Sequence, residues 1–146
     1  MVNENVEVTF GMIKPDAVEA CNTGKIIDLI EKNGFTILCL SKVMLEEEHA
    51  KAFYEVHKEK PFFKELVEFI CEGPVVAMAL MKENAIKDWR ELMGATNPAE
   101  AKEGTIRKLF GTSITNNAVH GSDSSETAAE EIQFFFGSPG ESEENN

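Results

Sequence analysis

The sequence predicts one α+β domain in which helices pack on a single antiparallel sheet. The chain has 146 residues and is 42% hydrophobic, which suffices for one core of ordinary size. Apolar residues alternate in some segments, as in strands, and recur at helical spacing in others. Strand-like segments are few and are separated by helices without a steady alternation, which is typical of α+β architecture. We assign residues 1–136 to this domain and expect 137–146 to form an acidic, disordered tail.

The first part of the chain reads as a strand, a helix and a second strand. Apolar and polar residues alternate loosely over 6–13, and Pro15 then ends the predicted strand. Isoleucines recur at helical spacing from Thr23 to Asn33, and Gly34 stands where a left-handed residue closes a helix. The apolar residues of 35–43 predict the second strand.

The middle of the chain predicts two helices, a strand and another helix. Residues 46–57 and 61–71 have helical spacing. The unbroken apolar run 75–81 predicts a strand that is buried on both faces or lies at the centre of the sheet. Asn84 is placed to cap a further helix, and Gly94 to close it.

The last part of the chain predicts a long loop, a short strand and a helix. No period survives over 95–117, and a loop of that length in a compact domain is usually functional. The apolar pair 118–119 predicts a short strand. Asp123 and Glu126 have the spacing of a capping box for a helix that reaches Phe135. The order of elements favours a ferredoxin-like (βαββαβ) arrangement with helices on one face of the sheet.

The charge balance disfavours polyanionic binding partners. With 14 Lys and Arg against 26 Asp and Glu, the net charge is −12, which repels nucleic acids and anionic lipids, so we expect neither nucleic-acid nor membrane binding. The N-terminus lacks a secretory signal, and no run approaches the roughly 18 apolar residues of a membrane span. Cys21, Cys39 and Cys71 fit neither a disulfide framework nor a zinc pattern. We expect reduced thiols in a cytoplasmic protein.

A few residues have the chemistry of a site. Arg90 and Arg107 are the two arginines of a chain that otherwise uses lysine, and the guanidinium fork can bind two phosphate oxygens at once. His120 follows an apolar pair and precedes a glycine, and its imidazole could be a base, a metal ligand, a nucleophile or a structural group. Lys14 could neutralise a phosphate or simply precede a turn.

Several spaced segments, taken together, resemble the nucleoside diphosphate kinase family. The run from Asn117 to Asp123, NAVHGSD, resembles the active-site signature of that family. The resemblance extends, in the same order as in the family, over nearly the whole chain apart from the tail. The matching segments are 10–18, 61–63, 73–75, 94–98, 104–107, 117–123 and 131–132.

The resemblance implies a role for each candidate residue. In this family a histidine takes the terminal phosphate of a nucleoside triphosphate and passes it to a diphosphate in a ping-pong cycle, so His120 is the implied nucleophile. Glu131 would hold the ring nitrogen that does not react, Ser122 matches the serine beside the histidine, Tyr54 would support the site, and Phe62 matches the ring on which the base stacks. The positions that match contacts to phosphates or ribose are Lys14, Arg90, Thr96, Arg107 and Asn117.

The resemblance also implies the cofactor and the assembly. Mg²⁺ would arrive with the nucleotide phosphates, so no dedicated carboxylate cage is needed. Stacking tolerates every base, which implies broad specificity among nucleoside di- and triphosphates. The chain is similar to the short form of the family, in which both homo-tetramers and homo-hexamers occur.

The chain departs from the family pattern at three places. Ala20, Cys21 and Asn22 stand where the family usually has Arg, Gly and an apolar residue. Glu103 replaces a common proline, and residues 108–109 replace the usual Gly-Asp. The last two departures lie in the predicted long loop, which packs at subunit contacts in the family.

Two other classes of function fit the same residues. One is a nucleotide-sensing or interaction module that kept the pocket and lost turnover. The other is a phosphohistidine carrier that passes its phosphate to a protein partner. The three hypotheses diverge in whether His120 takes up phosphate and whether a nucleoside diphosphate removes it.

Overall fold

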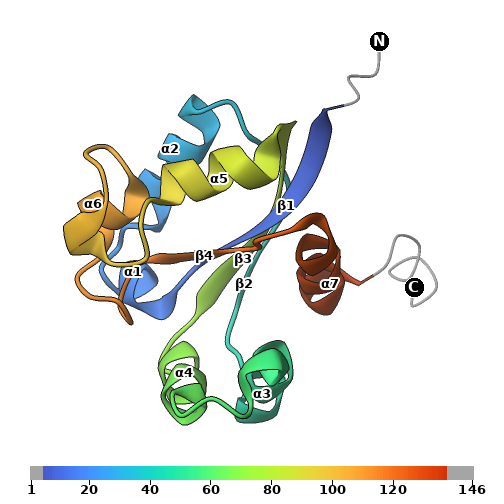
Figure 1. The fold of residues 1–146 in the computed structure, drawn as a ribbon, viewed down its shortest axis with the longest axis vertical. Coiled ribbons are helices and arrows are strands. Elements are labelled where there is room, and N and C mark those ends of the chain that lie inside the picture. The colour runs from blue at the N-terminus through green and yellow to red at the C-terminus, as the bar shows by residue number, and fades with distance from the viewer. Residues whose placement is uncertain (1–4, 138–146) are drawn as a thin grey trace.

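The computed structural model describes residues 5–137, which form a four-stranded antiparallel sheet and the helices around it (Figure 1). The strands lie in the order β2-β3-β1-β4, and each neighbouring pair is antiparallel. This confirms the predicted α+β fold. The expected tail falls almost wholly outside the described residues. The strands are β1 (Val6–Ile13), β2 (Thr36–Val43), β3 (Val75–Glu83) and β4 (Val119–Gly121).

The helices cover both faces of the sheet. In Figure 1, α2 and α5 lie on one side, whereas α3, α4 and α7 lie on the other. The prediction of helices on one face is therefore wrong. Within the described range, none of the helices has the length and apolar content to span a membrane. The helices are α1 (Pro15–Glu19), α2 (Thr23–Lys32), α3 (Glu47–Phe53), η1 (Glu55–His57), α4 (Phe63–Ile70), α5 (Ala85–Met93), η2 (Pro98–Glu100), α6 (Ile106–Phe110) and α7 (Ser125–Phe136).

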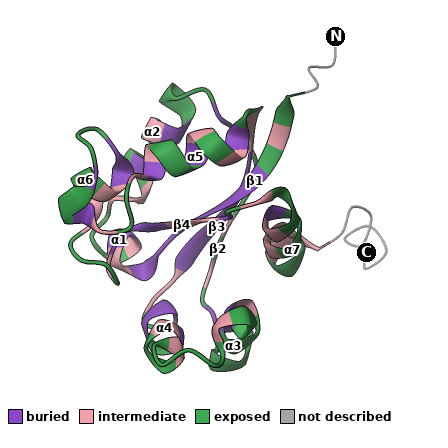
Figure 2. Cartoon of the chain, in the orientation of Figure 1, coloured by how far each residue is buried: buried purple, intermediate pink, exposed green. Residues whose placement is uncertain are grey.

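The central strands show why two layers of helices are needed. Successive side chains of a strand point to opposite faces. In β3, Val76 and Met78 enter the core under α2 and α5, while Val75 and Ala77 enter the core under α3, α4 and α7. Both cores are fully enclosed at these positions, and Figure 2 shows the buried stretches of β1 and β3 between the layers. The unbroken apolar run of β3 is thus a strand buried on both faces, as predicted.

The predicted long loop contains two short helices, η2 and α6. The side chain of Thr105 caps α6 by accepting the backbone N–H of Lys108 at 3.3 Å. The segment shows no helical period because a helix of five residues is little longer than one turn. The helix α1, also of five residues, was missed for the same reason.

Two predicted helix caps are wrong in detail. The hydroxyl of Ser124 accepts the backbone N–H of Thr127 at 3.1 Å and caps α7, so the capping residue is Ser124 rather than Asp123. Asn84 precedes α5 in a left-handed conformation, with φ of 56°, and its side chain makes no capping hydrogen bond. Asn84 thus holds the predicted N-cap position without the capping bond, whereas Asp123 is one residue away from the actual cap, a difference that local spacing does not resolve.

Candidate active site

His120 lies in the middle of the short strand β4. It pairs with Met12 of β1, so the sheet fixes its backbone. The ring packs edge-on against two aromatic rings, with centroids 6.1 Å from Phe10 and 5.4 Å from Phe53. The next residue is a glycine because any side chain at position 121 would overlap the indole of Trp89. The imidazole packs against the rings of Phe10 and Phe53 and is 25% exposed.

A carboxylate fixes the tautomer of this imidazole. Glu131, on α7, accepts a hydrogen bond from Nε2 of His120 through Oε2 at 2.8 Å. Its second oxygen, Oε1, accepts the hydroxyl of the buried Ser122. A carboxylate can only accept, so Nε2 carries the proton and Nδ1 keeps its lone pair. Among residues 5–137, Nδ1 has no hydrogen-bond partner.

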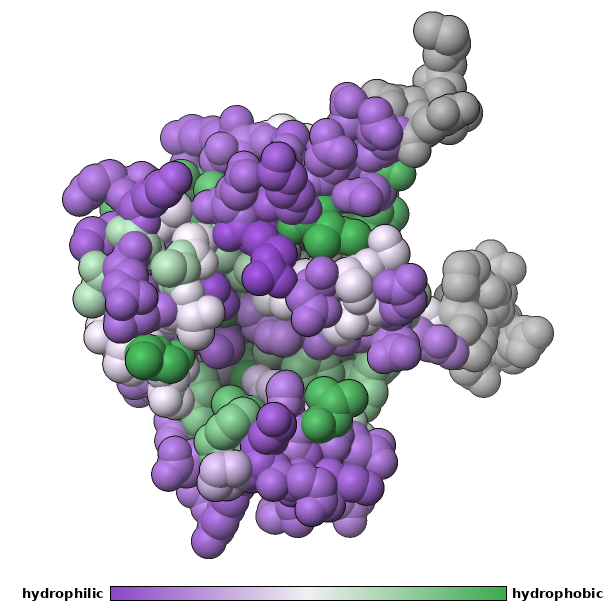
Figure 3. Space-filling view, in the orientation of Figure 1, coloured by the Kyte–Doolittle hydropathy of each residue, from purple (hydrophilic) through white to green (hydrophobic). Residues whose placement is uncertain are grey.

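The ring opens onto a cavity of about 450 Å³. Its walls come from the segment around η1 on one side and from α5, α6, β4 and α7 on the other, and Figure 3 shows the molecule hollowed between the α3–α4 pair and the rest of the domain. Six of the predicted site residues line this cavity: Tyr54, Arg90, Thr96, Arg107, His120 and Glu131.

Arg107 bridges the residue that follows α5 and the first residue of β4. Its Nη1 donates to the carbonyl of Gly94 at 3.0 Å, and its Nη2 donates to the carbonyl of Val119 at 2.9 Å. Burial, and then the nearby Arg90 guanidinium, lower the pKa of Arg107 to about 10. Two positive charges this close repel each other in the free protein, and a polyanion bound between them would relieve that repulsion.

Lys14 and Asn117 meet behind the cavity wall. The buried ammonium of Lys14 donates to Oδ1 of Asn117 at 2.8 Å and lies 5.8 Å from the centre of the Phe69 ring. The amide nitrogen of Asn117 donates to the carbonyl of Thr96 at 3.1 Å. Burial, and then Arg107, lower the pKa of Lys14 to about 8. Lys14 and Asn117 do not themselves line the cavity.

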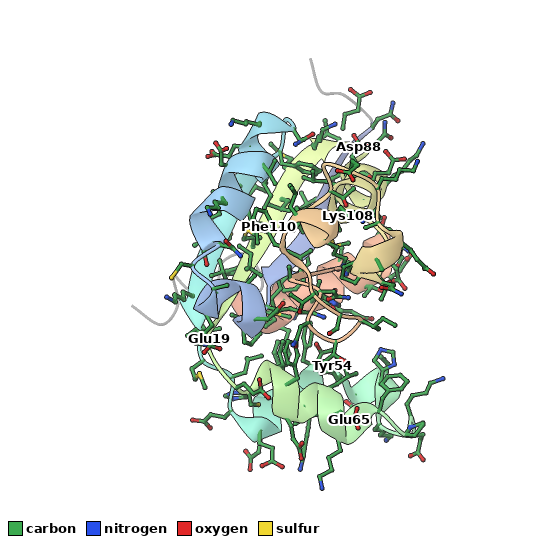
Figure 4. All side chains as sticks on the ribbon, turned by 90° about the vertical axis from the view of Figure 1, so that its left-hand side faces the viewer. Glu19, Tyr54, Glu65, Asp88, Lys108 and Phe110 are labelled. Carbon is green, nitrogen blue, oxygen red and sulfur yellow. The ribbon has the colours of Figure 1, made fainter. Side chains whose placement is uncertain are left out.

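The remaining aromatic residues lie on the helical side of the cavity. Tyr54 is buried on the side of the α3–α4 pair that faces the sheet (Figure 4), and burial and then Glu131 raise the pKa of its hydroxyl. Phe62 is 43% exposed and does not line the cavity, but its ring centroid is 5.8 Å from that of His57, which does. Phe62 therefore stands beside the opening.

Sequence reasoning missed several residues of the cavity wall. They carry no motif of their own, but Thr127 lies four residues before Glu131 on α7, so helical spacing from Glu131 could have found it. The missed lining residues include Phe53, His57 and Thr127. Asp123, which belongs to the NAVHGSD motif, and Glu130, which stands next to Glu131, also line the cavity.

These features define a class of protein. In this α+β fold, the imidazole of His120 is hydrogen-bonded to a carboxylate and lines the same cavity as two guanidinium groups. This arrangement is suited to a nucleophilic histidine in an enzyme that transfers phosphate. The family model described as Nucleoside diphosphate kinase matches residues 7–140.

Similar proteins point to the same family. Over 131 residues, covering 90% of this chain and 96% of each relative, the chain is 60% identical to a nucleoside diphosphate kinase of Geotalea uraniireducens and 57% identical to one of Geobacter sp.. It matches the crystal structure of the Aquifex aeolicus nucleoside diphosphate kinase with a TM-score of 0.87 and 48% identity, over 90% of this chain and 95% of that one. The chain therefore belongs to the nucleoside diphosphate kinase family, and its activity is transfer of phosphate between nucleotides.

Proposed function

We propose that phosphate transfer by this chain proceeds through a phosphohistidine on His120. The observation that carries the proposal is the hydrogen bond between Nε2 and Glu131, because it leaves Nδ1 as the unengaged nitrogen of a ring that lines the cavity. A nucleophilic imidazole needs one free nitrogen and one held nitrogen.

The transfer consists of two half-reactions. Nδ1 of His120 attacks the terminal phosphorus of a nucleoside triphosphate, and the bond from that phosphorus to the bridging oxygen breaks, so the diphosphate leaves with the electron pair. A terminal oxygen of a second nucleoside diphosphate then attacks the phosphorus, and the bond to Nδ1 breaks. Glu131 holds the Nε2 proton throughout and stabilises the positive charge that the ring gains when Nδ1 is phosphorylated. Ser122 keeps Glu131 oriented.

The cationic groups are proposed to bind the phosphates. Arg90 and Arg107 line the cavity, and Lys14 is linked to the lining residue Thr96 through two hydrogen bonds, with Asn117 between them. Phosphoryl transfer depends mainly on positioning and on neutralising charge at the phosphate oxygens. Thr96 lines the same wall and offers a hydroxyl for phosphate or ribose.

Mg²⁺ fits the oxygen donors of this cavity. The described residues contain no cluster of three or more potential metal ligands, but Mg²⁺ needs only one or two protein carboxylates when phosphates supply the other oxygens. Asp123 and Glu130 line the cavity and would be those donors. When bound with the nucleotide, the ion neutralises charge on the phosphate oxygens.

The base is proposed to stack on Phe62 beside the opening. The ring is exposed and apolar, and stacking does not require a particular base. This supports broad specificity among nucleoside di- and triphosphates, with Tyr54 as a buried support for the surrounding segment.

We also propose the domain organisation, cellular compartment and assembly of the enzyme. Residues 1–136 form one domain with 137–146 as a tail, the enzyme is cytoplasmic, and it forms a homo-tetramer or homo-hexamer without binding nucleic acid or membranes. The exposed Leu38 and Leu40 on the edge strand β2 support self-association, and the three free cysteines support a reducing compartment. Light scattering of the purified protein tests the subunit number.

Phosphate labelling tests the proposed intermediate. The protein is incubated with ATP labelled at the terminal phosphate and Mg²⁺. We expect acid-labile, alkali-stable label on the wild type, none on His120→Ala, and unchanged labelling on the matched control His49→Ala, whose residue is exposed on α3. Glu131→Ala should label more slowly than wild type, because Glu131 orients the ring and does not react.

Addition of a nucleoside diphosphate separates the three hypotheses. If the protein is the proposed enzyme, any nucleoside diphosphate discharges the label as the triphosphate. A protein that never takes up label is a sensor rather than an enzyme of this mechanism. A label that no nucleoside diphosphate removes identifies a carrier, and either of these results contradicts the proposed function.

A further inference from the structure

Asp16 connects two segments that are remote in the sequence. It lies on α1, just after β1, and its Oδ2 accepts the backbone N–H of Ala118 at 3.1 Å. The two residues are 102 positions apart. Ala118 is fully buried and lies two residues before His120. The bond therefore ends at the turn that leads into the strand of the nucleophile.

The turn at Ala118 is strained. Its φ is 73°, a left-handed value that residues with a side chain rarely adopt, and the N–H of Val119 donates to the carbonyl of Asn117 at 2.9 Å. A three-residue turn with positive φ at its centre is the rare form of the γ-turn. Such strain persists only where surrounding contacts hold it.

The segment after β1 supplies those contacts. The backbone N–H of Lys14 donates to the carbonyl of Ala118 at 2.8 Å, and the Lys14 ammonium donates to the side chain of Asn117. Asp16 accepts the N–H of Ala118, the residue at the centre of the turn. Without Asp16, that buried N–H would have no acceptor and the γ-turn would lose one of its two backbone anchors.

The strand that follows is short, and its backbone is held by β1 and by the hydrogen bond from Arg107 to the carbonyl of Val119. β4 comprises three residues, Val119–Gly121, and pairs with β1 on one side only. A shift in the γ-turn is therefore transmitted to the backbone of His120. The same turn carries Asn117, which holds the Lys14 ammonium. The nucleophile and a cationic group are thus positioned from one short turn.

We infer that Asp16 is a positioning residue for phosphate transfer, one that holds the strained turn at Ala118 and through it places His120 and the Lys14–Asn117 pair. It touches neither the nucleotide nor the reacting atoms. This inference rests on the proposed role of His120 as nucleophile. It adds a residue that lies outside the cavity wall and the NAVHGSD motif.

The test compares three single variants. Asp16→Ala removes the acceptor, Asp16→Asn keeps an oxygen that can accept the N–H of Ala118, and Asp28→Ala is a control that removes an exposed aspartate from the neighbouring helix α2. The rate of His120 labelling is divided by the number of nucleotide-binding sites measured by titration. A variant that folds only in part then loses binding sites, but its labelling rate per site is not lowered by the unfolded fraction. The assays run at pH 6.5, below the pKa of Lys14, because Asp16→Asn also removes a charge near that ammonium.

We expect Asp16→Ala to label roughly 10- to 100-fold more slowly per site, since a displacement of about 1 Å can cost about 100-fold in rate. Nucleotide affinity should change much less. Asp16→Asn should recover most of the rate, and Asp28→Ala should match the wild type. If Asp16→Ala does not fold, Asp16→Glu replaces it; its longer side chain misplaces the carboxylate and should also slow labelling.

Three results would overturn the inference. Wild-type labelling rates in Asp16→Ala, or in Asp16→Glu where that variant replaces it, show that Asp16 does not position His120. Equal slowing in Asp16→Ala and Asp16→Asn shows that the hydrogen bond to Ala118 is not what matters. Absence of label on the wild type removes both this inference and the proposed function, whereas the first two results leave the proposed function intact.

Discussion

The inner wall of the cavity and its mouth are built in opposite ways. The inner wall, defined as Arg107, His120 and Glu131 together with the buried Ser122 that bonds to Glu131 from behind, is joined by hydrogen bonds within the protein. The mouth, defined as Val56, His57 and Phe62, exposes its apolar groups, with Val56 82% and Phe62 43% exposed.

This difference separates reaction from recognition. Groups that are already held in place lose little freedom when the transition state forms, so they act on the rate. Exposed apolar groups gain their contacts only when a ligand covers them, so they act on affinity. We therefore expect substitutions in the inner wall to lower kcat and substitutions at the mouth to raise KM.

After loss of the nucleophile itself, the largest effect is expected for Arg107→Ala. Removing one cationic group from a phosphoryl-transfer site should lose about 2 to 4 kcal/mol of transition-state stabilisation, measured as the fall in kcat/KM. The variant also loses the hydrogen bonds to Gly94 and Val119, so its thermal midpoint should fall. Arg90→Ala, which removes an exposed arginine without such bonds, should lose less. Unchanged kinetics in Arg107→Ala would show that this residue does not take part in phosphate transfer.

A pH dependence is expected from Lys14. Burial lowers its pKa to about 8, so the free enzyme loses this positive charge as the pH rises through that value. Since kcat/KM reports the ionisation of the free enzyme, it should fall above about pH 8, by up to about 10-fold per pH unit. Lys14→Met should be slower at neutral pH and should lack this alkaline limb. Persistence of the limb in Lys14→Met would assign it to another group.

A smaller effect, on affinity alone, is expected for Phe62→Ala. Loss of a stacking ring should weaken nucleotide binding by about 1 kcal/mol, which is roughly a 5-fold rise in KM, with kcat little changed. Leu109→Ala, at a similarly exposed apolar residue outside the cavity, is the matched control. A fall in kcat as large as the rise in KM would break the distinction between mouth and inner wall.

Local patterns predicted the fold where the elements are long enough to show a period. The strand at 6–13 and the helix at 23–32 were found because each contains several alternations or turns. The two five-residue helices have no such repeat. Burial of both sheet faces depends on where α3, α4 and α7 return in space, and local spacing does not record that.

The candidate site shows the same limit. His120 and Glu131 were identified from a resemblance in short motifs, and the structure brings them together. The bonds from Lys14 to Asn117 and from Asp16 to Ala118 span more than 100 residues, and neither appears as a pattern in the sequence. His57 belongs to the mouth through its contact with Phe62, and only the folded chain shows that contact.

The smallest effect is expected far from the cavity, at Cys21. This exposed residue follows α1 with φ of 63°, where the family usually has glycine, and a left-handed residue with a side chain costs about 1 to 2 kcal/mol. Cys21→Gly removes that strain but gives the unfolded chain more freedom, so we expect a net gain of about 0.5 to 1 kcal/mol in the free energy of unfolding.

Cys39→Gly, the same change within β2, should instead destabilise the protein, because glycine weakens a strand interior. Urea unfolding measures both, and neither variant should change kcat or KM, since neither residue lines the cavity. Destabilisation by Cys21→Gly would mean that this departure from the family is compensated by contacts of the cysteine, and altered kinetics would mean that the turn after α1 is coupled to Asp16 and the inner wall.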